Sequence, residues 1–131
     1  MNVIFDVDGV LNSGEFIYDN VEKKFKIFGP DDADALNILK KYAKIFFVSG
    51  DKRGFSITKR RIEDMGFIVN EVSTNKRIDW IKENGLSLED TVYVGDGIFD
   101  HLVFKYVFFS FTTKDALDHV KKYASVVINR R

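Results

Sequence analysis

The segment VIFDVDGVLN, residues 3–12, places an uninterrupted apolar run directly before two aspartates and a glycine. Continuous runs of Val, Ile and Phe are typical of strands that are buried on both faces of a sheet. We therefore predict a buried strand over residues 3–5 that ends at Asp6, with Asp8 and Gly9 in the turn that follows it.

Similar short apolar runs alternate with helical patterns through the rest of the chain. A hairpin is predicted over 16–28, and a helix that contains Ile78 and Ile81 ends at Gly85. The other predicted strands cover 44–49, 67–69, 91–94, 107–111 and 124–128, and the other predicted helices cover 31–43, 55–65, 98–106 and 114–123. This alternation indicates right-handed βαβ units. We expect an α/β fold, a doubly wound (Rossmann-like) parallel sheet with a β-hairpin after the first strand.

The composition limits the classes of protein that fit. With 131 residues and no linker-like segment, the chain is expected to form a single domain over 1–131. Lys plus Arg (20) balances Asp plus Glu (20), so there is no electrostatic footprint for nucleic acid or for an anionic membrane. The lack of Cys excludes disulfides and thiolate metal sites and favours a cytoplasmic location. No apolar stretch is long enough to span a bilayer.

Polar residues recur where the predicted strands end, which is where doubly wound sheets bind ligands. Clustered carboxylates repel one another unless a cation joins them, and oxygen ligands of this kind suit Mg²⁺. A hydroxyl, backbone amides and an ammonium group suit a phosphate. The residues concerned are Asp6, Asp8, Ser49, Gly50, Lys76, Asp96 and Asp100.

Each of these residues also has a simpler explanation when it is taken alone. Asp and Gly are common turn residues at strand ends, and the first turn of a helix favours an acid such as Asp100. Arg77 and Lys82 lie close to Lys76 in the sequence and are alternative cations. The simpler explanation loses weight because the polar groups recur at the ends of several predicted strands.

Four segments together resemble the four motifs of the haloacid dehalogenase (HAD) superfamily of phosphotransferases. They are FDVDGVLN (5–12), VSG (48–50), Lys76 and VGDGIFD (94–100). The resemblance runs from the first predicted strand to about Ile128, which is nearly the whole chain.

The resemblance implies a role for each motif residue. Asp6 would be the nucleophile that forms an aspartyl-phosphate, and Asp8 would be the general acid/base. Mg²⁺ would be held by the Asp6 carboxylate, the Asp8 carbonyl and Asp96, with Asp100 in support. The residues that would hold the transferring phosphoryl group are Ser49, Gly50 and Lys76.

Motif spacing indicates the subfamily, because HAD proteins usually insert a cap domain between the first and second or the second and third motifs. The 40 residues between Asp8 and Ser49 and the 26 between Ser49 and Lys76 leave no room for a cap. The chain resembles the capless 3-deoxy-manno-octulosonate 8-phosphate phosphatases and acylneuraminate (nonulosonate) 9-phosphate phosphatases. This resemblance implies a Mg²⁺-dependent phosphomonoesterase for a sugar-acid phosphate, assembled through its hairpins into a homotetramer.

The segment 14–36 resembles the hairpin of that subfamily, followed by a Phe-x-x-x-Asp stretch that here comprises Phe28 and Asp32. Octulosonate enzymes usually have an Arg after the Gly of the second motif, whereas this chain has Asp51 and Lys52. An acid followed by Lys is more similar to the nonulosonate type. The resemblance therefore makes Asp32, Asp51 and Lys52 candidate substrate residues.

Two other classes of protein fit part of the pattern. A receiver domain has a similar length and sheet, but its phospho-acceptor Asp follows the third strand, where this chain has Asn70. Some capless relatives are non-catalytic oligomerisation modules of sugar-activating systems. Gly97, which replaces the second of the paired acids usual in the fourth motif, keeps that alternative open. The retained Asp6, Asp8 and Asp96 favour an enzyme.

Overall fold

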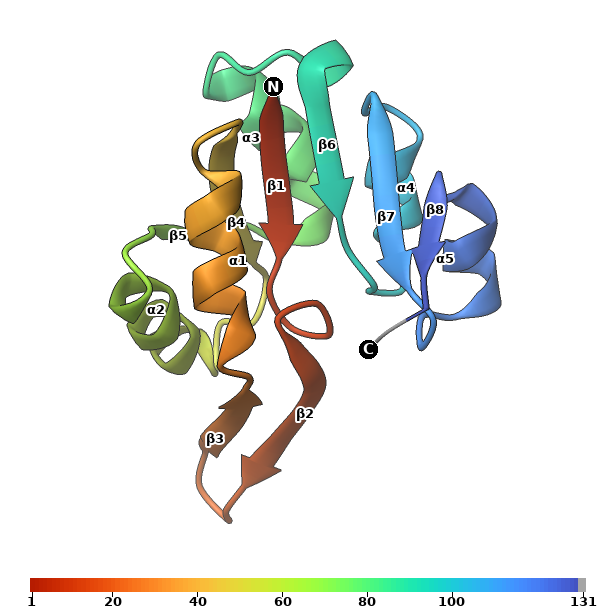
Figure 1. Cartoon of the computed structure of the whole chain (residues 1–131). Coiled ribbons are helices and arrows are strands. Elements are labelled where there is room, and N and C mark those ends of the chain that lie inside the picture. The colour runs from red at the N-terminus through yellow and green to blue at the C-terminus, as the bar shows by residue number, and fades with distance from the viewer. Residues whose placement is uncertain (130–131) are drawn as a thin grey trace.

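A computed structural model describes residues 1–129 and contains a parallel sheet with the strand order β5-β4-β1-β6-β7-β8 (Figure 1). The apolar run at the start of the chain forms the central strand β1, which pairs with β4 on one side and β6 on the other. This arrangement confirms the predicted doubly wound α/β class without a cap domain. The strands of this sheet are β1 (Asn2–Asp6), β4 (Lys44–Ser49), β5 (Val69–Glu71), β6 (Thr91–Val94), β7 (Phe109–Thr113) and β8 (Val126–Ile128).

Helices cover both faces of the sheet because side chains of successive strand residues point to opposite faces. In β4, Phe47 packs with the core under α1 and α2, whereas Val48 packs with the core under α3, α4 and α5. Both side chains are fully buried. The helices are α1 (Asp31–Leu39), α2 (Phe55–Asp64), α3 (Arg77–Glu83), α4 (His101–Phe104) and α5 (Asp118–Tyr123), and the 3₁₀ turns are η1 (Thr74–Lys76) and η2 (Leu88–Asp90).

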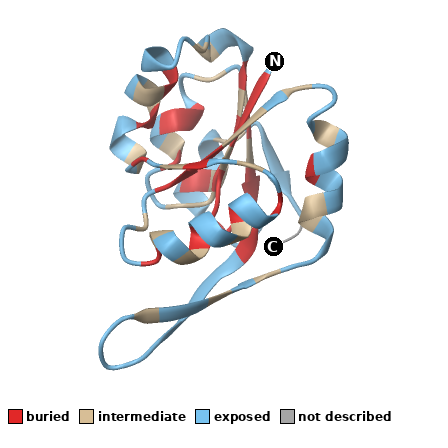
Figure 2. Cartoon of the chain, turned by 90° about the vertical axis from the view of Figure 1, so that its left-hand side faces the viewer, coloured by how far each residue is buried: buried red, intermediate tan, exposed pale blue. Residues whose placement is uncertain are grey.

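The predicted hairpin forms a separate two-stranded antiparallel sheet of β2 (Asn12–Tyr18) and β3 (Lys23–Phe28). Its turn is closed by Asp19, whose Oδ1 accepts hydrogen bonds from the N–H groups of Val21 and Glu22. The hairpin projects from the end of the sheet at which β1 terminates, and most of its residues are exposed (Figure 2).

Several elements differ from the predicted ranges because pairing with the sheet decides where they lie. The strand predicted over 67–69 lies at 69–71, where Val69 pairs with Phe47 and Glu71 pairs with Ser49. The strand predicted over 107–111 lies at 109–113, and that predicted over 124–128 begins at Val126. The helices predicted over 98–106 and 114–123 are shorter, at 101–104 and 118–123, because turns occupy residues 98–100, 105–106 and 114–115.

Strand order brings the ends of β1, β4 and β6 side by side. The chain moves from β1 outward to β4 and β5, and then crosses to β6 on the other side of β1. Such a switch point is where doubly wound sheets leave a crevice for a ligand. Among the described residues, no helix is both long and apolar enough to cross a bilayer.

Candidate active site

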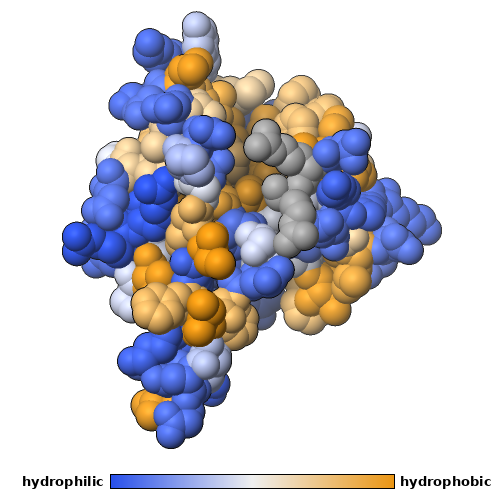
Figure 3. Space-filling model, turned by 60° about the horizontal axis from the view of Figure 1, so that its bottom comes forward, coloured by the Kyte–Doolittle hydropathy of each residue, from blue (hydrophilic) through white to orange (hydrophobic). Residues whose placement is uncertain are grey.

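A cavity of about 910 Å³ opens at the C-terminal ends of the central strands. Figure 3 looks onto this end of the molecule, where hydrophobic and hydrophilic side chains are mixed. The cavity is bounded by the loops after β1, β4, β5 and β6 and by the hairpin, so it lies at the switch point of the sheet. Its lining comprises Asp6, Asp8, Gly14, Phe16, Lys23, Gly50, Asp51, Ser73, Thr74, Asn75, Arg77, Asp96, Gly97, Phe99 and Leu102.

Asp6 ends β1 and forms an ion pair with Arg77, whose Nη2 lies 3.1 Å from Asp6 Oδ1. Burial raises the pKa of Asp6 well above its usual range, and the nearby carboxylates of Asp100 and Asp96 raise it further, whereas Arg77 opposes the rise. The Arg77 side chain is itself only 3% exposed. Arg77 therefore orients Asp6 and offsets part of the negative charge of the site.

Asp96, two residues after β6, lies against the backbone of Gly9 in the turn after β1. Gly9 has φ +85°, and a Cβ there would overlap the Asp96 carboxylate, so only glycine allows this approach. Asp96 Oδ1 is buried and has no hydrogen-bond partner among the described residues. Burial raises the pKa of Asp96 to about 7, and the Asp100 carboxylate contributes to the rise. The site thus contains a carboxylate for which no described residue supplies an ion-pair partner.

Asp100 is almost fully buried and is fixed by the protein through both oxygens. Its Oδ1 accepts a hydrogen bond from the Tyr93 hydroxyl (2.6 Å) and another from Arg77 Nη1 (3.2 Å). Its Oδ2 accepts from the N–H of Gly97 (2.7 Å). Arg77 Nη1 also contacts the Tyr93 hydroxyl (2.6 Å). Asp100 therefore anchors Arg77 and the loop that carries Asp96.

The carboxylates have the chemistry of a divalent-cation site. Asp6, Asp96 and Asp100 each offer an oxygen, and these three atoms lie within 4.8 Å of one another. Both oxygens of Asp100 already accept hydrogen bonds from protein groups. The carboxylates best suited to hold a cation are therefore those of Asp6 and Asp96. An all-oxygen donor set with the unpartnered Asp96 Oδ1 fits Mg²⁺.

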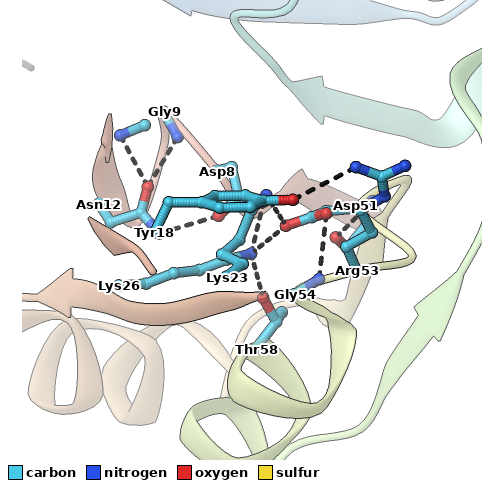
Figure 4. Close-up of polar contacts among 12 residues, drawn as sticks. Asp8, Gly9, Asn12, Tyr18, Lys23, Lys26, Asp51, Arg53, Gly54 and Thr58 are labelled. Atoms are coloured by element: carbon cyan, nitrogen blue, oxygen red, sulfur yellow. Dashed lines mark hydrogen bonds and ion pairs between the residues drawn. The ribbon is translucent and has the colours of Figure 1, made fainter. Parts of the chain in front are cut away.

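Asp8 lines the same cavity, and both of its oxygens have partners from the hairpin (Figure 4). Oδ1 accepts from Asn12 Nδ2 (3.0 Å), and Oδ2 accepts from Lys26 Nζ (2.9 Å). Asp51, after β4, accepts from Lys23 (2.7 Å) and forms an ion pair with Lys26 (2.8 Å). Burial would raise the pKa of Asp51, but the two lysines lower it to about 2.

The other predicted site residues differ in their placement. Ser49 is buried at the end of β4, and its Oγ accepts from the N–H of Asp51 (3.3 Å). Lys76 and Lys52 line a neighbouring cavity instead, and Asp32 lines a third cavity beside α1. The structure does not bring these last three side chains to the carboxylate cluster.

Arg77 occupies the position beside Asp6 at which the sequence predicts Lys76. Residue 77 lies four positions before the buried Ile81, so both lie on the face of α3 that packs on the sheet. This spacing is the signal in the sequence that could have identified Arg77. The hairpin residues Lys23 and Lys26 carry no comparable signal, because lysines are common on exposed strands.

Comparison with known proteins gives the following relatives. No protein-family model matches the chain. The chain is 32% identical over 132 residues to the 3-deoxy-D-manno-octulosonate 8-phosphate phosphatase KdsC of Haemophilus influenzae, and the match covers 97% of this chain and 72% of the relative. The cobalt-bound form of the H. influenzae deoxy-D-mannose-octulosonate 8-phosphate phosphatase matches with a TM-score of 0.86 at 30% identity, over 98% of this chain and 77% of that one.

A more distant structure has the same fold. The 3-deoxy-D-manno-octulosonate 8-phosphate phosphatase from Moraxella catarrhalis, in complex with magnesium ion, phosphate ion and KDO, matches with a TM-score of 0.84 at 20% identity. The match covers 98% of this chain and 75% of that one.

We predict that the protein binds Mg²⁺ more tightly at pH 8 than at pH 6. Burial and Asp100 raise the pKa of Asp96 to about 7, so below that pH the carboxyl is protonated and must lose its proton to bind a cation. For one proton, the affinity falls up to about tenfold per pH unit below this pKa. Calorimetric titration in two buffers of different ionisation enthalpy measures both the affinity and the protons released. Equal dissociation constants at the two pH values, or equal binding by Asp96→Asn, would contradict the prediction.

Proposed function

Because this chain belongs to the KdsC family of HAD-superfamily phosphatases, we propose that it hydrolyses a sugar-acid phosphate of the octulosonate or nonulosonate type, using Mg²⁺ and an aspartyl-phosphate intermediate on Asp6. The observation that carries the proposal is the presence of Asp6, Asp8, Asp96 and Arg77 in one cavity at the end of β1. Membership of this family excludes the receiver-domain alternative.

In the first step, a carboxylate oxygen of Asp6 attacks the phosphorus of the substrate while the bond from phosphorus to the leaving oxygen breaks. Asp8, two residues along the chain and in the same cavity, gives its proton to that leaving oxygen. Attack of an anion on a phosphate dianion is opposed by repulsion. Arg77 offsets part of this negative charge beside Asp6.

In the second step, water attacks the phosphorus of the aspartyl-phosphate. Asp8, now ionised, takes a proton from that water, and the bond between phosphorus and Asp6 breaks. The products are inorganic phosphate and free Asp6, with the proton back on Asp8. One carboxyl group therefore acts as acid and then as base.

Asp6 and Asp96, with the backbone carbonyl of Asp8, are the groups that would hold Mg²⁺. When bound, the ion supplies Lewis-acid neutralisation of the phosphoryl oxygens. The unpartnered Asp96 Oδ1 and the acidic cluster of the chain support this assignment. The magnesium complex of the Moraxella relative and the cobalt-bound form of the Haemophilus relative also support it.

The substrate class is inferred from the names of the relatives and from the cavity. The Haemophilus relative is named for an octulosonate 8-phosphate, and the cavity of about 910 Å³ has room for a sugar acid together with its phosphate. The cationic Lys23 and the anionic Asp51 both line it. A panel of eight-carbon and nine-carbon sugar-acid phosphates, assayed for phosphate release, would distinguish the two types.

Asp6→Asn is expected to reduce phosphate release by about three orders of magnitude or more, because a neutral amide is a poor nucleophile. The measurement is Mg²⁺-dependent hydrolysis of a sugar-acid phosphate, with circular dichroism to show that the variant is folded. Asp64→Asn, on the exposed face of α2, is the matched control and should retain wild-type activity. Substantial turnover by Asp6→Asn would refute the assignment of the nucleophile.

Replacement of the two neighbouring cations by methionine tests which of them serves the site. We expect Arg77→Met to lose at least about tenfold more activity than Lys76→Met, because Arg77 pairs with Asp6 and Lys76 lines another cavity. Steady-state kinetics of both variants, with Arg77→Lys as a milder change, gives the comparison. A larger loss in Lys76→Met would restore the role that the motif predicts for Lys76.

We further propose that the hairpin assembles the protein into a homotetramer. Exposed apolar side chains lie on both of its faces, with exposed fractions of 53% for Ile17 and 60% for Phe25, which pair across the strands. Phe16 and Tyr18 contact each other (5.8 Å between ring centroids) and are also about half exposed. A lone two-stranded ribbon rarely presents so much apolar surface unless a partner covers it.

The double variant Ile17→Ser/Phe25→Ser should dissociate this assembly, because it removes the apolar pair without altering the turn. Light scattering after size exclusion measures the mass of each variant. Tyr42→Ser is the matched control, since Tyr42 is 79% exposed and precedes β4 at the opposite end of the sheet. A wild-type monomer at working concentration, or a double variant of unchanged mass, would contradict the proposal.

A further inference from the structure

Lys26 of β3 is a charged side chain inside the protein, with an exposed fraction of 1%. Its ammonium group has three N–H donors and contacts three acceptors. They are Asp8 Oδ2 (2.9 Å), Asp51 Oδ2 (2.8 Å) and Thr58 Oγ1 (2.9 Å) (Figure 4). Asp8 follows β1, Asp51 follows β4, and Thr58 lies on α2. An isolated buried ammonium group would be strongly destabilising, so these contacts are what allow Lys26 to be buried.

The backbone leaves room for this cluster at Gly54, which precedes α2. A Cβ at Gly54 would overlap Asp51 Oδ2 and would lie 2.8 Å from both Lys23 Cδ and Lys26 Cε. The Gly54 N–H also donates to Asp51 Oδ1 (3.1 Å). The cluster is therefore closely packed, and neither lysine can move far from the carboxylates.

The two lysines of the cluster differ in their relation to Asp8. Lys23 contacts Asp51 and lies over the Phe16 ring, with Nζ 3.8 Å from the ring centroid. Only Lys26 contacts both Asp51 and Asp8. Lys23 lines the cavity, whereas Lys26 does not and so would not touch a bound substrate.

Lys26 and Asn12 together fix the Asp8 carboxyl group. Asn12, at the base of β2, donates to Asp8 Oδ1, while its own Oδ1 accepts from the N–H groups of Gly9 (2.9 Å) and Gly14 (2.8 Å). Lys26 holds the other oxygen of Asp8. With a partner on each oxygen, the carboxyl group cannot rotate without losing a hydrogen bond.

We propose that Lys26 is a positioning residue for Asp8, which aims the Asp8 carboxyl group at the leaving oxygen of the substrate. This inference rests on the proposed function, because it concerns the acid/base step of that reaction. Lys26 acts through Asp8 and not on the substrate. Its removal should therefore impair the same step that Asp8 performs, and the loss should depend on the leaving group in the same way as the loss caused by removal of Asp8.

The experiment compares two phosphate esters with different needs for a proton on the leaving oxygen. An alkyl phosphate needs protonation, whereas nitrophenyl phosphate has a leaving group that departs as the anion. Leaving-group release is measured in single turnover for the wild type, Lys26→Met, Asp8→Asn and the double variant. Lys26→Met should slow the alkyl ester by about 10–100-fold, as expected for a misplaced catalytic group, and the nitrophenyl ester much less.

Two further lysine variants are matched controls. Lys24→Met removes an exposed lysine of the same strand, whose ion pairs with described residues are to Asp19 and Glu22 in the turn, and it should leave both rates unchanged. Lys23→Met removes the other lysine bound to Asp51 and should not change the ratio of the two rates. The double variant Lys26→Met/Asp8→Asn should be no slower than Asp8→Asn, because both changes act on one group.

Equal slowing of the two esters by Lys26→Met, or slowing of the double variant by the product of the single effects, would overturn the inference. If Lys26→Met fails to fold, Lys26→Gln keeps a shorter donor at the position and should show the same ester dependence. A wild-type protein that cleaves neither of these esters and none of the sugar-acid phosphates of the panel would instead refute the proposed function. The inference is then judged by a crystal structure of the variant, in which an unmoved Asp8 side chain would overturn it.

Discussion

Mutual repulsion among the carboxylates at the end of β1 is the constraint around which this end of the molecule is organised. Oxygens of Asp6, Asp96 and Asp100 lie within 4.8 Å of one another. Two unit charges about 4 Å apart repel by about 4 kcal/mol at an effective dielectric constant of 20. Arg77 is the cation placed among them, with contacts to Asp6 and Asp100. Among the described residues Asp96 has no ion-pair partner, so this carboxyl group is where a divalent cation would contribute most.

The sequence predicts the fold and the acidic part of the site because both depend on local patterns. Buried parallel strands have continuous apolar runs, and the polar residues that end those runs must meet at one edge of the sheet. For this reason the positions of Asp6, Asp8 and Asp96 follow from strand boundaries alone. The ranges of short elements were less predictable. Strand β5, for example, is set by pairing with β4 and not by its own residues.

The cationic part of the site could not be predicted in the same way. Lys76 and Arg77 are neighbours, and only the orientation of α3 decides which of them faces the carboxylates. The hairpin presents a related difficulty, because the side chains of Lys23 and Lys26 are largely buried whereas Ile17, Phe25 and Ile27 are exposed. An amphipathic pattern normally predicts that the lysines are exposed and the apolar side chains are buried. The reversal depends on Asp8 and Asp51, which are distant from the hairpin lysines in the sequence.

Asp6 and Asp8 are separated by one residue, yet different parts of the molecule hold their side chains. Asp6 is bound to Arg77 of α3, so its side chain is held by the sheet and its helices. Asp8 is bound to Asn12 and Lys26 and so belongs to the hairpin. Val7 between them is fully buried. Because Lys26 is also held by Asp51 and Thr58, the hairpin could displace Asp8 relative to Asp6 only by breaking those contacts, so the separation of the two carboxyl groups depends on how the hairpin is docked.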